Sequence, residues 1–182
     1  MLEQMKAPHV KLKIWSDDNL DLLRLINAPE MMEHLGGPET EEQIVNRHKR
    51  YLEIDGKGSG RMFSIVLLPG NETVGSVGYW DSMWKGESVY EIGWSVLPSF
   101  QGRGIATAAV AEAIADAKVE RKHKYIHAFP SINNPASNAV CQKLGFQLMS
   151  NCEFEYPPGN FMQCNDWRLE VDAANIVSDE RL

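Results

Sequence analysis

A short turn rich in glycine carries the clearest chemical signal in the sequence, because residues 101–106 read Gln-Gly-Arg-Gly-Ile-Ala between a predicted strand and a predicted helix. The first N–H groups of a helix have no partner inside it, and the helix dipole adds partial positive charge, so this position suits a phosphate. Gly102 and Gly104 let an anion approach the backbone and tolerate positive φ, and Arg103 can add a charge-assisted contact. We expect an anion site here; the alternative is a turn that only joins strand to helix.

The strand before this turn has one bulky face and one face of small residues, because successive side chains of a strand point to opposite sides. Four large apolar residues share the first face and predict core packing: Tyr90, Ile92, Trp94 and Val96. The second face carries one carboxylate, Glu91, near Gly93 and Ser95. We expect this face to leave room for a ligand against the sheet, unless Glu91 is simply an acidic residue on a half-exposed surface.

Two common nucleotide motifs are excluded by their spacing and context. Gly102-x-Gly104 resembles the start of a dinucleotide fingerprint, but Thr107 stands where the third glycine belongs, and no acidic residue ends a second parallel strand about 20 positions on. Residues 56–59, Gly-Lys-Gly-Ser, resemble a P-loop, but Tyr51 stands where its first glycine belongs and the segment leads from a helix into a strand. We therefore expect neither of these folds.

The elements that must position these residues follow one another without an evident linker or repeat. Alternating polar and apolar residues predict strands, whereas helical periodicity and capping residues predict helices. The predicted strands are residues 10–15, 61–68, 73–80, 88–97, 125–129, 147–155 and 162–171. The first predicted helix follows the N-cap candidates at residues 16–18 and carries Leu20, Leu23 and Ile26; the others are residues 39–54, 104–120 and 134–145. This order, β-α-α-β-β-β-α-β-α-β-β, predicts a mixed α/β fold with helices on both faces of one sheet.

Composition is that of an ordinary globular protein, with 182 residues, 43% hydrophobic and 24% charged. We expect one domain over residues 9–171, a flexible N-terminus over residues 1–8 and a polar tail over residues 172–182. No signal peptide and no apolar stretch long enough to span a bilayer is recognised, so we expect a cytoplasmic protein without a membrane partner. The net charge of -7 argues against nucleic acid as a partner.

The three cysteines, Cys141, Cys152 and Cys164, are odd in number and contain no C-x-x-C pair. A disulfide framework or a zinc site is therefore not expected, and reduced thiols fit better. We expect no metal. The oligomeric state is open, a homodimer included.

Two motifs together resemble one enzyme superfamily. Gln101-x-x-Gly104-x-Ala106 is similar to the Q/R-x-x-G-x-G/A signature of the GNAT acetyltransferases. Asn134-x-x-Ser137, followed by Lys-Leu-Gly-Phe at residues 143–146, resembles a second segment of the same superfamily. The resemblance extends over nearly the whole chain and is closest to the branch of the ribosomal-protein N-terminal acetyltransferases. It implies a mostly antiparallel central sheet and transfer of acetyl from acetyl-CoA to a primary amine in a ternary complex.

The resemblance also implies where the co-substrate acetyl-CoA binds. The amides of the turn would hold its pyrophosphate: Gln101, Gly102, Arg103, Gly104, Ile105 and Ala106. The pantetheine arm would lie between splayed strands, paired to the backbone around Val96 and Leu97, where an amide would stabilise the oxyanion. Asn134 would contact the pantetheine and Ser137 would lie near the cofactor. Both have a structural alternative, since Asn134 is a strong N-cap and Ser137 a first-turn residue.

By the same resemblance, Glu91 is similar to the strand carboxylate that deprotonates the acceptor, directly or through water. His127 on the neighbouring strand is the alternative base, because histidine titrates near neutral pH. Many members carry a tyrosine four residues after the serine as the acid for the departing thiolate, but here that residue is Cys141. The acid is therefore open; Tyr156 is one candidate, and a thiol leaving group has a pKa near 8.5, so a strong acid is dispensable.

The acceptor is the least defined part of the prediction. Its pocket would be lined by residues 28–40, a loop at residues 81–87 and the last strands, with Trp80, Trp84 and Tyr156 as apolar walls. The acceptor would be a small-molecule amine, such as an amino sugar or a polyamine, or a protein N-terminus. A CoA-binding sensor without catalysis is the main alternative function, motivated by the missing tyrosine, and a nucleotide-binding module is a weaker one.

Overall fold

Seven strands form a single mixed sheet in the order β1-β2-β3-β4-β5-β7-β6 in the computed structural model, which describes residues 6–156 and 158–171. The strands are β1 (Val10–Ile14), β2 (Gly60–Leu67), β3 (Glu72–Trp84), β4 (Glu87–Val96), β5 (Tyr125–Ala128), β6 (Gln147–Glu155) and β7 (Phe161–Glu170). The α-helices are α1 (Leu20–Ile26), α2 (Glu41–Glu53), α3 (Ile105–Glu120) and α4 (Pro135–Lys143). The predicted element order and the mostly antiparallel sheet are confirmed; only β4 and β5 pair in parallel. The predicted tail, 172–182, and residues 1–5 lie outside the described residues.

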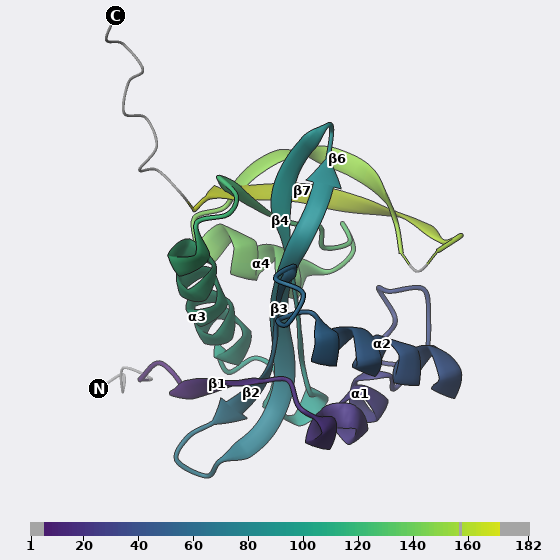
Figure 1. Ribbon diagram of the computed structural model, residues 1–182, viewed down its shortest axis with the longest axis vertical. Coiled ribbons are helices and arrows are strands. Elements are labelled where there is room, and N and C mark those ends of the chain that lie inside the picture. The colour runs from purple at the N-terminus through teal and green to yellow at the C-terminus, as the bar shows by residue number, and fades with distance from the viewer. Residues whose placement is uncertain (1–5, 157, 172–182) are drawn as a thin grey trace, which may run out of the picture.

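Helices cover both faces of the sheet, as expected (Figure 1). On one face, α3 and α4 pack on a large core that includes the predicted bulky residues Tyr90 and Ile92. The alanines of α3 make this close packing possible, since Ala109, Ala113 and Ala117 lie four residues apart and are fully buried. On the other face, α1 and α2 form a smaller cluster around Trp15. No helix among the described residues has the length and apolar character that a bilayer crossing demands.

The largest difference from the predicted elements is the β3–β4 hairpin. β3 continues to Trp84 and β4 begins at Glu87, so the predicted loop at residues 81–87 is wrong. Lys85 and Gly86 alone make the turn, with φ of 49° and 79°. Positive φ at both central residues defines the tight turn whose twist matches paired strands. The hairpin consequently extends as far as β7, where Trp84 reaches Asp166.

Local capping fixes the helix ends near the predicted positions. Thr40 and Gln43 form a capping box, so α2 begins at Glu41 rather than at residue 39. Asn134 caps α4 through its side chain, and Gly145 follows that helix with φ of 81°. The N-terminus of α3, in contrast, receives no hydrogen bond from a capping side chain.

Candidate active site

The N-terminus of α3 has the geometry of an anion site. Gly104 occupies the N-cap position with φ of 79°, and the first intrahelical bond runs from the N–H of Ala108 to the carbonyl of Gly104, at 3.1 Å. The N–H groups from Gly104 to Thr107 are therefore left without an acceptor in the helix. Gly102, with φ of 72°, borders open space, since a Cβ there would meet no heavy atom within 4 Å. At Gly104, in contrast, a Cβ would lie 3.5 Å from the Pro8 ring, so the turn is open at Gly102 and bordered by Pro8 at Gly104.

Gln101 ties this turn to the end of β4. Its side-chain Nε2 donates to the carbonyl oxygen of Val96 at 2.9 Å. The Arg103 guanidinium lies 5.5 Å from the centre of the Phe100 ring, where cation–π attraction holds an exposed cation. Gln101 therefore acts at least through its side chain, by fixing the turn against the strand, and Arg103 remains at the rim of the amide site.

β4 and β5 diverge directly beside this turn. They pair only at Tyr90 with Ile126 and at Glu91 with His127, whereas β4 continues to Val96. The unpaired stretch from Ile92 to Val96 is about 16 Å long at the usual rise per strand residue. This edge of β4, which we call the gap between β4 and β5, runs from the last pair at Glu91 toward the turn. A strand edge of this length is suited to an extended chain that hydrogen-bonds to it.

The two residues predicted to line this gap present their backbones differently. The N–H of Leu97 donates to the carbonyl of Val74 on the β3 side at 2.8 Å, and its own carbonyl accepts from Phe100 at 2.9 Å. Because backbone groups alternate along a strand, Val96 turns its N–H and carbonyl to the β5 side. Val96 therefore faces the gap with its backbone, while both backbone groups of Leu97 are already bonded within the chain.

Asn134 and Ser137 stand at the start of α4. The Oδ1 atom of Asn134 accepts the backbone N–H of Ser137 at 3.2 Å, so the capping interpretation of both residues is confirmed. Their contact with a cofactor stays a prediction. Asn138, which the sequence interpretation missed, holds this helix to β7: its Oδ1 accepts from Asn165 and from Trp167, each at 2.8 Å. No sequence signal separates Asn138 from an ordinary helix residue, because its partners come from a distant strand.

Glu91 lies half-buried at the closed end of the gap, beside Trp80 of β3 and His127 of β5. The expected open space over this face is absent at Gly93, because the Trp80 indole lies across it; a Cβ on Gly93 would come within 3.0 Å of the ring. The small residue thus accommodates tryptophan rather than a ligand. Burial raises the pKa of the Glu91 carboxyl, and the polar groups of Trp80 and Ser82 and the charge of His127 only partly oppose the rise.

His127 belongs to a buried polar pair that the sequence did not reveal. Its Nδ1 atom lies 2.6 Å from Oδ1 of Asp166, and the indole N–H of Trp84 donates to Oδ2 of the same carboxylate at 2.9 Å. The imidazole stacks on Phe129 with ring centres 5.8 Å apart. Burial alone would raise the pKa of Asp166, but the hydrogen bonds from His127 and Trp84 hold it below its ordinary value. Asp166 is therefore an ionised carboxylate inside the protein.

Comparison with known proteins identifies the family of the chain. A model of the acetyltransferase (GNAT) domain matches residues 9–147. The chain belongs to the GNAT acetyltransferase family. No curated protein sequence gives a significant match. The chain is accordingly an acyltransferase by family.

Solved structures with this GNAT fold span several acceptors. One is an acetyltransferase from Salmonella typhimurium that modifies the N-terminal serine of ribosomal protein L7/L12; it is 18% identical with a TM-score of 0.73, over 90% of this chain and 95% of that one. Another is the spermidine N-acetyltransferase of Vibrio cholerae in complex with CoA and spermine, 15% identical with a TM-score of 0.70, over 88% and 95%. A third is an aminoglycoside acetyltransferase in complex with coenzyme A, 18% identical with a TM-score of 0.70, over 89% and 95%. At these identities the likeness shows the fold.

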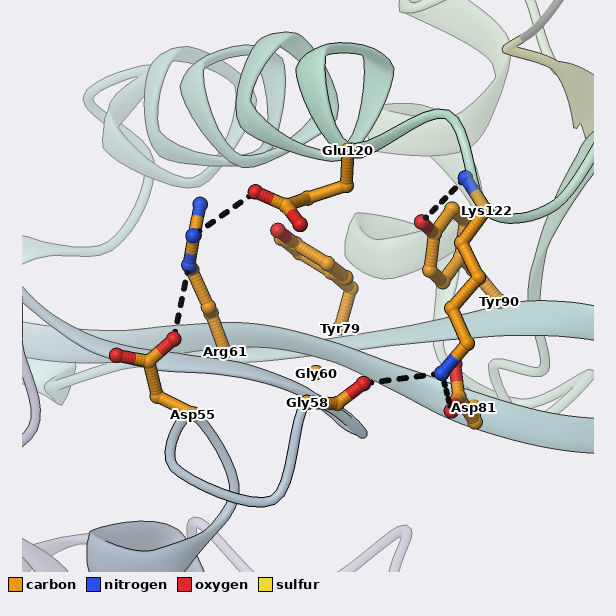
Figure 2. Close-up of a pocket in the computed structure, with 9 residues that line it drawn as sticks. All are labelled: Asp55, Gly58, Gly60, Arg61, Tyr79, Asp81, Tyr90, Glu120 and Lys122. Carbon is orange, nitrogen blue, oxygen red and sulfur yellow. Dashed lines mark hydrogen bonds and ion pairs between the residues drawn. The ribbon is translucent and has the colours of Figure 1, made fainter.

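The pocket drawn in Figure 2 lies at the opposite end of α3 from the turn at residues 101–106. It has a volume of about 120 Å³ and polar walls. Glu120 is the last residue of α3, and a helix of 16 residues is about 24 Å long. Arg61 pairs there with Asp55, Asp116 and Glu120 at 2.8–3.1 Å. The charges of this pocket bind one another, and it is separate from the site described above.

Tyr156, predicted to line the acceptor pocket, lies against α2, near Arg47 and Tyr51. Burial raises the pKa of its phenol, and the nearby Arg47 guanidinium opposes the rise. Arg47 is itself buried and pairs with Glu39 at 2.5 Å. In Figure 1 the β6–β7 hairpin extends toward the side of the molecule where α2 lies. The role of Tyr156 as a wall of the acceptor pocket stays a prediction.

Cys141 occupies the place of the tyrosine that many GNAT enzymes carry, and it is fully buried in the main core. Burial raises the pKa of its thiol to about 12. A nucleophilic cysteine needs thiolate character and access to substrate, and Cys141 has neither. It is a small apolar residue of the core.

We therefore expect no covalent acetyl-enzyme at Cys141. Mass spectrometry of the intact protein after incubation with acetyl-CoA alone should show no stoichiometric adduct on this residue. The half-exposed Cys152 serves as the internal control for adventitious thiol acetylation. An adduct on Cys141 that disappears when acceptor is added would establish a ping-pong route instead of direct transfer.

Proposed function

We propose that the protein is an N-acetyltransferase that transfers acetyl from acetyl-CoA to a primary amine by direct attack in a ternary complex. The observation that carries this proposal is the order of three features along β4: Glu91 at its paired end, a strand edge without a β5 partner up to Val96, and then the turn at Gly104 without a capping side chain. We propose that they serve as proton acceptor, binding edge for an extended arm and phosphate site.

The residues present fit coenzyme A. The amides from Gln101 to Ala106 would hold the pyrophosphate, with Arg103 at the rim. Val96 offers backbone groups at the edge of the gap, and its carbonyl is already oriented by Gln101. Asn134 uses its oxygen for the cap, which leaves its amide NH₂ to donate to the arm. When bound, acetyl-CoA supplies the activated thioester, which needs no protein nucleophile.

Glu91 is proposed as the general base. An amine attacks only when neutral, and a buried carboxyl whose pKa is raised is a better proton acceptor near neutral pH than an exposed one. Trp80 lies over the strand next to it and excludes water from that side. His127 remains the alternative base because it adjoins Glu91 across the two parallel strands.

The acceptor is proposed to be a small-molecule amine or a protein N-terminus, the substrates named for the solved relatives above. The free thiols of Cys141, Cys152 and Cys164 suit the reducing cytoplasm, where we place the enzyme. A buried cysteine stands where many GNAT enzymes carry the tyrosine acid, and this favours one alternative function, a CoA-binding sensor without turnover.

A screen of thiol release separates the two functions. With acetyl-CoA present, the enzyme should release free CoA in proportion to an added amine from a panel of polyamines, amino sugars and peptides with free N-termini. Each acceptor with its amine already acetylated is the matched control and should release none. Binding of CoA without release by any amine would favour the sensor over the enzyme.

A further inference from the structure

We propose that Asp166 is a positioning residue that holds His127 as the Nδ1–H tautomer, so that Nε2 of His127 carries the second proton of the transfer to the leaving sulfur. This inference rests on the proposed function and deepens it. It gives the site the acid that Cys141 cannot supply.

Proton balance requires a second carrier. A primary ammonium loses two protons on the way to an amide, one before it attacks and one after the new C–N bond has formed. Glu91 can accept the first and pass it to solvent. Nε2 of His127 would accept the second from the same nitrogen and return it to the sulfur as the C–S bond breaks. The sum is ammonium and thioester giving amide, free thiol and one proton in solution.

The sheet places His127 where this carrier is needed. Glu91 and His127 are the last paired residues of β4 and β5 before the gap opens, and paired residues on neighbouring strands share one face. An extended arm that starts at the Gly104 turn and follows the gap ends at these two side chains. The sulfur at the end of that arm is therefore expected next to both of them.

Asp166 determines which nitrogen of His127 can act. It lies at the Nδ1 side at 2.6 Å, and an ionised carboxylate only accepts, so Nδ1 carries the hydrogen. The bond to Asp166 is the only hydrogen bond of the His127 ring to residues 6–156 and 158–171, so Nε2 is left without a partner among them. A neutral ring then has its lone pair on Nε2, and the carboxylate stabilises the imidazolium that forms when a proton arrives.

The other charged groups near the ring do not compete for this role. Arg168 of β7 lies opposite His127 of β5 in the strand register, but its guanidinium is directed at Tyr125, 4.2 Å from the centre of that ring. Lys85, at the hairpin turn, acts on Asp166 and helps to keep it ionised. The carboxylate also accepts a hydrogen bond from the indole of Trp84, and burial and the carboxylate's charge raise the pKa of the nearby Cys152 thiol.

The first test is the tautomer itself, which needs no turnover. Long-range ¹H–¹⁵N correlation of the histidine rings at pH 8 should show His127 protonated at Nδ1 and bare at Nε2. In Asp166→Asn the amide NH₂ can donate to Nδ1, so the proton should move to Nε2. A wild-type ring protonated at Nε2 under these conditions would overturn the proposal, whatever the enzyme's substrate.

The second test is kinetic. Asp166→Asn should lower kcat about tenfold or more with the KM for acetyl-CoA within about threefold of wild type. Asp116→Asn is the control, because it makes the same change in a half-buried carboxylate that pairs with Arg61 in the separate pocket; its kcat should stay within about threefold of wild type. If the His127–Asp166 pair has only a structural role, both variants should lose stability and their kcat values should not differ from each other. That result would overturn the proposal. Absence of thiol release by the wild type with every amine is a different result and would defeat the proposed function itself.

Discussion

Replacing Glu91 by glutamine should lower kcat about 100-fold or more on a high-pKa amine at pH 7, with nearly unchanged affinity for acetyl-CoA. A lysine-like amine has a pKa near 10.4, so at pH 7.5 only about one molecule in 800 is neutral, a handicap of roughly 4 kcal/mol. A general base contributes about 10²–10⁴-fold, enough to offset much of that handicap. An α-amine with a pKa near 7.7–8.0 is largely neutral already, so Glu91→Gln should lower kcat only slightly on such an acceptor.

The dependence of kcat on pH should differ between the wild type and Glu91→Gln. Burial raises the pKa of the Glu91 carboxyl. Its carboxylate, the basic form, therefore appears only as pH rises through that raised value, and wild-type kcat should rise with it. The Gln variant lacks this limb and follows only the deprotonation of the acceptor, so the difference should shrink at high pH. The measurement is kcat against pH for both proteins.

A second glutamate on the same strand provides the control. Glu87 is exposed at the start of β4, and Glu87→Gln should leave the pH profile unchanged. Curves for wild type and Glu91→Gln that lie within about threefold of each other at pH 7 would remove Glu91 as the base. His127 or solvent would then take the role.

Gly104→Val should weaken acetyl-CoA binding by at least roughly 100-fold. The branched side chain would stand in front of the amides that hold the pyrophosphate, and hydrogen bonds to a charged group are worth about 1.5–3 kcal/mol each, so the loss of two is sufficient. The structure adds a second cause, because φ at Gly104 is 79°, where valine is strained. Calorimetric titration of the folded variant with acetyl-CoA measures the change.

Gly86→Val separates backbone strain at positive φ from obstruction of the phosphate site. Gly86 has the same φ of 79° and open space around its Cβ position, but it lies in the β3–β4 turn. It should therefore lower stability as Gly104→Val does and bind acetyl-CoA normally. An unchanged dissociation constant in a folded Gly104→Val protein would remove the turn at residues 101–106 as the phosphate site.

Local sequence signals predicted most of the fold. The capping residue Asn134, the glycine after α4 and the alternation along β4 each act within a few neighbours, so their effect is visible in the chain itself. The order of elements followed from such signals. The turn at Gly104 was predictable for the same reason, since its function depends on backbone conformation rather than on distant partners.

Contacts between distant strands were not predictable from the sequence. Asp166 becomes important only because β7 places it beside His127, and Asn138 only because α4 packs on the same strand. The small residue Gly93 indicated space, but the sequence does not tell whether a ligand or Trp80 fills it. The long β3–β4 hairpin was missed because Lys85-Gly86 is a weaker turn signal than Asn-Gly.

The brief pairing of β4 with β5 has a consequence for cooperativity. Only two residue pairs join the antiparallel unit β1–β4 to the antiparallel unit β5–β7 within the sheet. The backbone amides of β4 that face this border beyond Glu91 should therefore exchange their hydrogens faster than those bonded to β3. In the proposed complex, an arm bound along this edge would act as a short eighth strand between the two units. We therefore expect acetyl-CoA to slow this exchange and to make unfolding of the two units more cooperative.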